Sequence, residues 1–196
     1  MPYILISASI IISLILAFSC REDLITVRYS VKSNKIKNKV KAVLLSDLHG
    51  AKYGNRQEKL FSILHKENPD IIFLAGDIVE NRKRKQNDYD FTDRIGKEFR
   101  TFYTIGNHEV RTGRTDVIKK ELTAKGIMIP DKKAWDIIIN GNPLRIISLD
   151  DSEKYDREGH PEEWSSNFFK KEALCDPSFF NILLSHHPNH PELYFD

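Results

Sequence analysis

The stretch Ile71-Ile72-Phe73-Leu74-Ala75-Gly76-Asp77 decides the fold that this sequence predicts. An apolar run that includes β-branched residues and ends in Gly-Asp is typical of a buried strand followed by a turn. Comparable strand-like runs occur at Ala42–Leu45, Thr101–Ile105 and Phe179–Leu184. Segments with helical periodicity separate them, for example Asn55–Glu67. Because strands and helices alternate along the chain, we expect an α/β fold with a mixed sheet.

Polar motifs follow four of these predicted strands at the point where each strand ends. The motifs are Asp47-Leu48-His49, Gly76-Asp77, Gly106-Asn107-His108-Glu109 and Ser185-His186-His187-Pro188. In open α/β sheets, ligand-binding residues collect at the carboxyl ends of the strands. We therefore expect the following residues to meet at one rim of the sheet: Asp47, His49, Asp77, Asn107, His108 and His186.

Carboxylate, imidazole and amide groups in this combination are typical of a two-metal site for phosphate-ester hydrolysis. Two divalent ions neutralise the anionic oxygens of the ester and make a water molecule more acidic. Asp77 is the natural bridging ligand, since it follows a buried strand directly after Gly76. His108 is suited to stabilise the transition state or to protonate the leaving group. Two cysteines, Cys20 and Cys175, are too few for a thiolate metal site.

The overall composition fits one globular domain without a strongly charged partner. The chain has 196 residues, 40% hydrophobic residues and a net charge of +2. Its basic stretches, at 32–41 and 82–85, lack interleaved aromatic residues. We therefore expect no nucleic-acid partner, and a salt-independent binding response would exclude one.

The N-terminal residues differ from those of an ordinary globular domain. Residues 1–20 contain no charged side chain and are nearly long enough to span a bilayer, so we expect a membrane anchor or signal segment there. Lysines after this segment would keep the domain cytoplasmic by the positive-inside rule. A cleaved signal or a lipid anchor would instead place it outside. The sequence thus predicts membrane association through one N-terminal segment and leaves the side of the membrane open.

Residues 21–41 form a basic region between this segment and the predicted domain at 42–196. Val27-Tyr29-Val31 and Ile36-Val40-Ala42 follow a period of two, with lysines on the other face. This alternation predicts a half-exposed strand pair. The lysines are suited either to a solvated strand face or to contact with anionic lipid headgroups.

The four motifs resemble those of the calcineurin-like metallophosphoesterase superfamily, specifically its bacterial membrane-tethered branch. In that family the motifs run Asp-x-His, Gly-Asp, Gly-Asn-His-Asp/Glu and His, and they match between Ser46 and Pro188. The resemblance implies a four-layer α/β/β/α sandwich with mixed sheets. It implies that Asp47, His49 and Asp77 bind one metal ion. Asp77, Asn107 and His186 would bind the second, and His108 would serve the transition state.

The same resemblance implies two divalent ions, such as Mn, Fe, Zn or Mg, and a phosphate-ester substrate. Relatives hydrolyse phosphodiesters, phosphomonoesters or pyrophosphates, and a membrane-tethered subgroup cleaves the nucleotide-linked lipid UDP-diacylglucosamine. The family's last motif, Gly-His-x-His, has no match before Asp196. We therefore expect a C-terminally truncated domain that lacks its last strands. The alternative function is that of a non-catalytic remnant that acts as a membrane-associated binding protein.

Overall fold

The computed structural model describes residues 24–79, 85–131, 133–159, 170 and 174–187. The chain divides into two units, residues 1–31 and 32–196. Residues 24–31 of the first unit have no regular secondary structure. The predicted anchor at residues 1–20 lies outside the described residues and stays a prediction. In the part of the chain that the structure describes, every helix is too short or too polar to span a bilayer.

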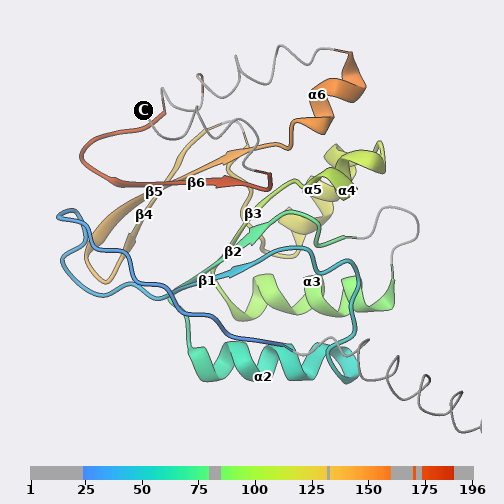
Figure 1. Cartoon of the computed structure of the whole chain (residues 1–196), viewed down its shortest axis with the longest axis horizontal. Coiled ribbons are helices and arrows are strands. Elements are labelled where there is room, and N and C mark those ends of the chain that lie inside the picture. The colour runs from blue at the N-terminus through green and yellow to red at the C-terminus, as the bar shows by residue number, and fades with distance from the viewer. Residues whose placement is uncertain (1–23, 80–84, 132, 160–169, 171–173, 188–196) are drawn as a thin grey trace, which may run out of the picture. The chain divides into compact units, whose positions relative to one another are not determined.

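The described part of the second unit contains two three-stranded sheets (Figure 1). The first sheet is parallel in the order β1-β2-β3, with β1 at Ala42–Leu45, β2 at Ile71–Ala75 and β3 at Thr101–Thr104. The second is mixed in the order β4-β5-β6, with β4 at Trp135–Ile139, β5 at Asn142–Leu149 and β6 at Phe180–Ser185. Asn140 and Gly141, both at positive φ, form the tight turn between β4 and β5. The predicted α/β class with mixed pairing is therefore confirmed.

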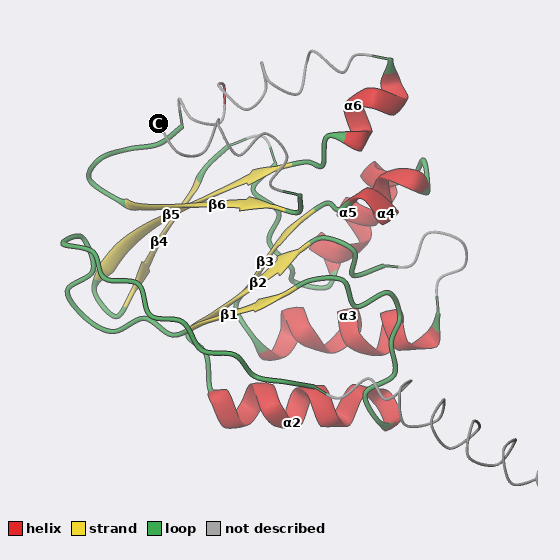
Figure 2. Cartoon of the chain, viewed as in Figure 1, coloured by secondary structure: helices red, strands yellow, loops and turns green. Residues whose placement is uncertain are grey.

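Helices cover the first sheet on the face opposite the second sheet. The helical elements are the 3-10 turn η1 at Asn55–Gln57, α2 at Glu58–Glu67, α3 at Gln86–Glu98, α4 at Asn107–Arg111, α5 at Thr115–Ala124 and α6 at Glu153–Glu158. Figure 2 shows α2 and α3 along one face of β1–β3, with β4–β6 on the other side. Three layers of the predicted four-layer sandwich are thus described. Residues 160–169 and 171–173 lie outside the described residues, and the fourth layer stays a prediction.

The buried strand β2 joins these layers. Its residues alternate between the two faces, as strand geometry requires. Ile71 and Phe73 belong to the core cluster that contains Ile139, Leu144, Ile146 and Leu184 of the second sheet. Ile72 and Leu74, also fully buried, point to the helical side. Burial of each such side chain contributes about 1.5–3 kcal/mol, so the ends of β2 and its neighbours are held firmly.

The predicted strand pair in the basic region is wrong. Residues 24–41 contain no strand, and Val27, Tyr29 and Val31 are exposed. Ile36 and Val40 are instead partly buried, and their side chains pack against the core between the sheets. The side chain of Asn142 holds this loop, because its Oδ1 accepts the backbone N–H of Lys37 at 2.7 Å. A period-two pattern produces a strand only where a partner strand completes its hydrogen bonds.

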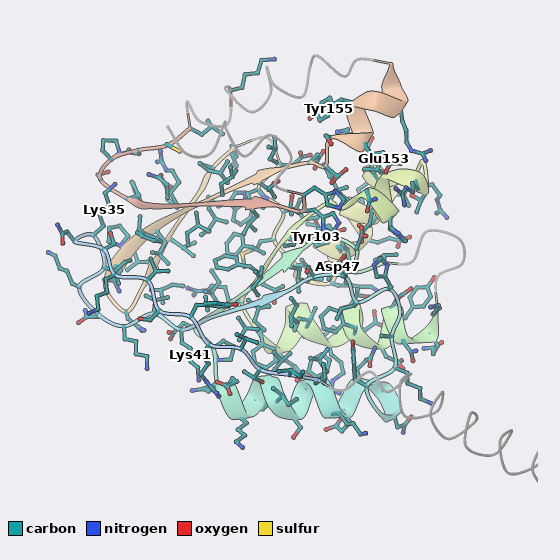
Figure 3. The ribbon with its side chains drawn as sticks, in the orientation of Figure 1. Lys35, Lys41, Asp47, Tyr103, Glu153 and Tyr155 are labelled. Carbon is teal, nitrogen blue, oxygen red and sulfur yellow. The ribbon has the colours of Figure 1, made fainter. Side chains whose placement is uncertain are left out.

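The structure also contains short elements that the sequence did not predict. Met128 makes an isolated bridge to Phe102 of β3. The helices α4 and α6 are one or two turns long and begin a few residues after the ends of β3 and β5, with Glu153 at the start of α6 (Figure 3). Hydrophobic periodicity cannot develop in helices this short.

Candidate metal centre

The carboxyl ends of β1, β2, β3, β5 and β6 lie at the same end of the two sheets (Figure 1). The loops after β1 and β2 are tied together by their backbones. The N–H of Asp47 donates to the Gly76 carbonyl at 3.2 Å, and the N–H of His49 donates to the Asp77 carbonyl at 3.1 Å. Asp47, His49 and Asp77 all have positive φ, at 56°, 46° and 56° respectively. Non-glycine residues in this strained region gather at functional sites.

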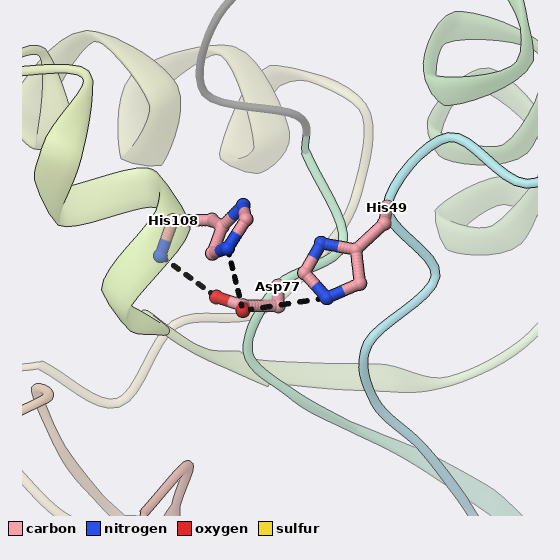
Figure 4. Close-up of side chains that lie close together, drawn as sticks. All are labelled: His49, Asp77 and His108. Atoms are coloured by element: carbon pink, nitrogen blue, oxygen red, sulfur yellow. Dashed lines mark hydrogen bonds and ion pairs between the residues drawn. The ribbon is translucent and has the colours of Figure 1, made fainter.

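The Asp77 carboxylate lies at the centre of the site. Its Oδ1 accepts the backbone N–H of His108 at 2.9 Å. Its Oδ2 faces three imidazole nitrogens, the Nε2 atoms of His186 at 3.5 Å, His49 at 3.6 Å and His108 at 3.9 Å. Figure 4 shows His49 and His108 on two sides of Asp77, with their rings 4.3 Å apart. Together with Asp47, whose Oδ1 is 3.6 Å from His49 Nε2, these residues form what we call the Asp77 cluster.

The electrostatics of the cluster favour a cation beside Asp77. Asp77 is 2% exposed, and the side chain of His186 is 3% exposed. Burial opposes charge on His186, but the Asp77 carboxylate outweighs it and raises the pKa of His186 to about 9. Burial likewise opposes charge on Asp77, yet His186 and the His108 N–H leave the pKa of Asp77 below its ordinary value. The buried Asp77 carboxylate beside the buried His186 ring therefore favours a positive charge between them.

The donor set fits divalent metal ions. His186 Nε2 is buried and has no hydrogen-bond partner among the described residues, while its Nδ1 lies 2.6 Å from the Ala75 carbonyl. A carbonyl only accepts, so Nδ1 carries a proton and Nε2 is the nitrogen that faces Asp77. Positive charge between Nε2 and the carboxylate oxygen is supplied either by a proton on Nε2 or by a metal ion in its place. A second nitrogen fixed by a backbone carbonyl is the usual arrangement of metal-binding histidines.

Two groups of potential ligand atoms share Asp77. One contains His49, Asp77 and His108, the other Asp47, Asp77 and His186, and the atoms within each group lie within 4.8 Å of one another. These groups pair the residues differently from the resemblance, which placed Asp47 with His49 and gave His108 a role in the transition state. Asn107 is the first residue of α4 and is half-buried. Among the described hydrogen bonds none involves its side-chain amide, so its ligand role stays a prediction.

Glu109 holds the backbone around the cluster, although the sequence assigned it no role. Its fully buried carboxylate accepts four backbone N–H groups. Oε2 accepts from Asp77 at 2.9 Å and Gly106 at 3.0 Å, and Oε1 accepts from Ile78 and Val79, both at 2.8 Å. Burial raises the pKa of Glu109 despite these donors. Its position as the last residue of the Gly-Asn-His-Glu motif was the signal for this function.

A family model described as calcineurin-like phosphoesterase matches residues 40–196. The chain belongs to this family. A curated relative, an uncharacterized metallophosphoesterase of Campylobacter jejuni, is 30% identical over 95 residues. That alignment covers 45% of this chain and 24% of the relative, so the chain spans about a quarter of the length of that protein.

One solved structure supports the fold of this chain. The phosphopantetheinyl hydrolase of Mycobacterium tuberculosis superposes with a TM-score of 0.54 at 16% identity, over 76% of this chain and 69% of that one. A novel archaeal phosphodiesterase gives a TM-score of 0.40 at 16% identity, over 74% of this chain and 83% of that one. The first likeness shows a shared fold and nothing finer, and the second is too low to carry an argument.

The structure also brings Asp151 and His187 to this rim of the two sheets. Asp151 follows β5, and its Oδ2 lies 2.7 Å from His187 Nδ1. The ring of His187 is 4.2 Å from that of His186. Neither residue was predicted to be a ligand, although His187 belongs to one of the four motifs. Their signal was the same as that of the other site residues, since both directly follow strand ends.

Gly76 gives a prediction about how the cluster is assembled. It has φ of +80°, and an added Cβ would lie 2.6 Å from the His186 ring and 2.7 Å from the Gly106 Cα. Gly76→Ala should therefore displace His186 in addition to straining the backbone. We expect a loss of at least about 2 kcal/mol in the free energy of unfolding and weaker metal binding, measured by urea denaturation and calorimetry.

Gly113→Ala is the matched control. Gly113 also has positive φ, +66°, but nothing lies within 4 Å of the added Cβ. This variant should show only the backbone cost of about 1–2 kcal/mol and unchanged metal binding. Equal effects on metal affinity in both variants would mean that Gly76 is not needed to make room for His186.

Proposed function

We propose that this chain hydrolyses phosphate esters with two divalent metal ions bound at the Asp77 cluster. The observation that carries the proposal is the buried Asp77 Oδ2, which faces three imidazole Nε2 atoms at 3.5–3.9 Å. Asp77 is shared by both candidate ligand groups, as a bridging carboxylate would be. Ions held there would neutralise the charge of the ester and make a water molecule more acidic. Membership of the calcineurin-like phosphoesterases supports the same reaction.

The residues of the cluster have separate roles in this reaction. Asp77 is held in place through both its backbone and its Oδ1, so its Oδ2 keeps a fixed direction towards the imidazoles. His49 and His108 are partly exposed, with side chains 36% and 26% accessible, and therefore line the open side of the cluster. From this position the His108 ring is suited to donate a hydrogen bond to a phosphoryl oxygen or a proton to the leaving group.

Metal removal tests the proposal. The full chain should hydrolyse bis(p-nitrophenyl) phosphate or p-nitrophenyl phosphate in the presence of Mn²⁺, and excess chelator should abolish the reaction. Adding back Mn²⁺, Zn²⁺ or Mg²⁺ to the chelated protein should restore it, with release of p-nitrophenolate as the measurement. The two substrates separate phosphodiesterase from phosphomonoesterase activity.

Two results would contradict the proposal. Hydrolysis that continues unchanged in chelator would exclude a metal-dependent reaction. A folded chain that binds fewer than two ions and hydrolyses neither substrate would favour the alternative of a non-catalytic binding protein. Metal content measured by mass spectrometry on the same sample distinguishes these two cases.

A further inference from the structure

Two consecutive histidines at the end of β6 are fixed in the same way. His186 Nδ1 lies 2.6 Å from the Ala75 carbonyl, and His187 Nδ1 lies 2.7 Å from Asp151 Oδ2. A carbonyl oxygen and a carboxylate can only accept a hydrogen bond, so in each ring Nδ1 is the donor. Nε2 of each ring is therefore the nitrogen left for another partner. This is how metal-binding histidines are oriented in proteins, by a carbonyl or a carboxylate behind the ring.

Asp151 is built to orient His187. Its side chain is 1% exposed, and its other oxygen, Oδ1, accepts the backbone N–H of Glu153 at 3.0 Å at the start of α6. The helix is in turn fastened to α4, since Arg111 Nε lies 2.9 Å from the Glu153 carboxylate. Asp151 is thus held on both oxygens. A buried carboxylate with no freedom to turn fixes the ring that donates to it.

His187 is exposed and accessible to a ligand, whereas Asp151 is buried. The His187 side chain is 43% exposed, and its ring lies 4.2 Å from that of His186. One potential ligand atom from each of Asp151, His186 and His187 lies within 4.8 Å of the others. His186 also belongs to the group that contains Asp47 and Asp77. The site of His187 is therefore continuous with the Asp77 cluster through His186.

We propose that His187 is a further ligand of a divalent metal ion at this rim, and that Asp151 is the residue that positions it. The proposal deepens the proposed function, on which it rests, because it adds an imidazole to the ligands around His186. Potential ligand atoms of the two rings lie within 4.8 Å of each other, which places His187 beside an ion that His186 would bind. An added imidazole favours ions such as Zn²⁺ or Fe²⁺ over Mg²⁺, which prefers oxygen ligands.

Cobalt binding to the full chain tests this inference without any activity measurement. Co²⁺ is titrated into the chelator-treated protein, with affinity measured by calorimetry and coordination by visible absorption. We expect His187→Gln to weaken Co²⁺ binding at least about tenfold and to change the visible bands. Asp151→Asn should weaken it about 10–100-fold, because the amide no longer supplies a carboxylate to the ring.

His65→Gln is the matched control. His65 is also partly exposed and also pairs with a carboxylate, Glu98 at 2.8 Å, but it lies on α2 away from the cluster. This variant should bind Co²⁺ as the parent chain does. Thermal unfolding of all variants shows whether each is folded, and the exposed position of His187 makes its substitution the least disruptive of the site variants.

The Asp77→Asn variant separates failure of this inference from failure of the proposed function. If Asp77→Asn abolishes binding and His187→Gln leaves affinity and spectrum unchanged, His187 is not a ligand and the proposed function stands. If neither substitution affects Co²⁺ binding, the Asp77 cluster is not a metal site and both fail. An equal loss of Co²⁺ affinity in His187→Gln and His65→Gln would also overturn the inference, because the loss would then not depend on where the histidine lies.

Discussion

Asp77→Asn should lower the rate of phosphate-ester hydrolysis at least about 100-fold while leaving the protein folded. The amide oxygen of asparagine can still accept the N–H of His108, which Asp77 Oδ1 accepts at 2.9 Å. The amide nitrogen would face His186 Nε2 and can donate to it. The substitution therefore removes the negative charge that both candidate ligand groups share and keeps the local hydrogen bonds.

The measurement is the initial rate with Mn²⁺, compared with the thermal midpoint from circular dichroism. Asp93→Asn is the control, because Asp93 is an exposed aspartate on α3 that pairs only with a surface lysine, Lys125, at 2.6 Å in the described contacts. The control should keep full activity. If Asp77→Asn retains more than a tenth of the parent rate, Asp77 does not bridge the ions.

Glu109→Gln should destabilise the protein by about 2–5 kcal/mol. Each carboxylate oxygen of Glu109 accepts two backbone N–H groups. In glutamine one of these oxygens becomes an NH₂ group, which is itself a donor and cannot accept the two N–H groups that face it. Burial prevents water from satisfying the groups left behind. The residues affected, Asp77 and Gly106, carry or adjoin the cluster, so metal affinity should fall with stability.

Urea denaturation measures this loss, with Glu58→Gln as the control. Glu58 is an exposed glutamate that pairs with Arg94 at 3.0 Å, and its side chain is 70% exposed. Surface pairs of this kind contribute up to about 1 kcal/mol, so the control should change little. A loss below about 1 kcal/mol in Glu109→Gln would show that its four hydrogen bonds are not needed to hold the rim.

The buried strand β2 and the place of Asp77 at its end were predictable because they depend on local patterns. Ile71–Ala75 is apolar throughout, which a strand buried on both faces requires, and the structure buries every one of its residues. Asp77 follows two residues later, so its place at the strand end needed no knowledge of distant contacts. The helix that begins at Glu58 was predicted for a similar reason, since its apolar residues repeat with the helical period.

Features that depend on long-range partners were missed or wrong. The alternating residues at 27–31 looked like a strand, but in the structure no strand forms there. Met128 pairs with β3 only as a single bridge. The role of Glu109 depends on three residues some thirty positions earlier, Asp77, Ile78 and Val79, whose N–H groups it accepts. None of these pairings has a local signature.

The sequence by itself determined the α/β class, the family and the residues that gather at the rim, because strand ends and motif spacing are local properties. Only the tertiary structure decided how these residues are grouped. In the structure, the Asp77 carboxylate faces three imidazoles, and Glu109 accepts the backbone N–H of Asp77. It also joined Asp151 to His187 across two strand ends. Distances between side chains on different strands follow from packing of the two sheets, and packing depends on the whole unit.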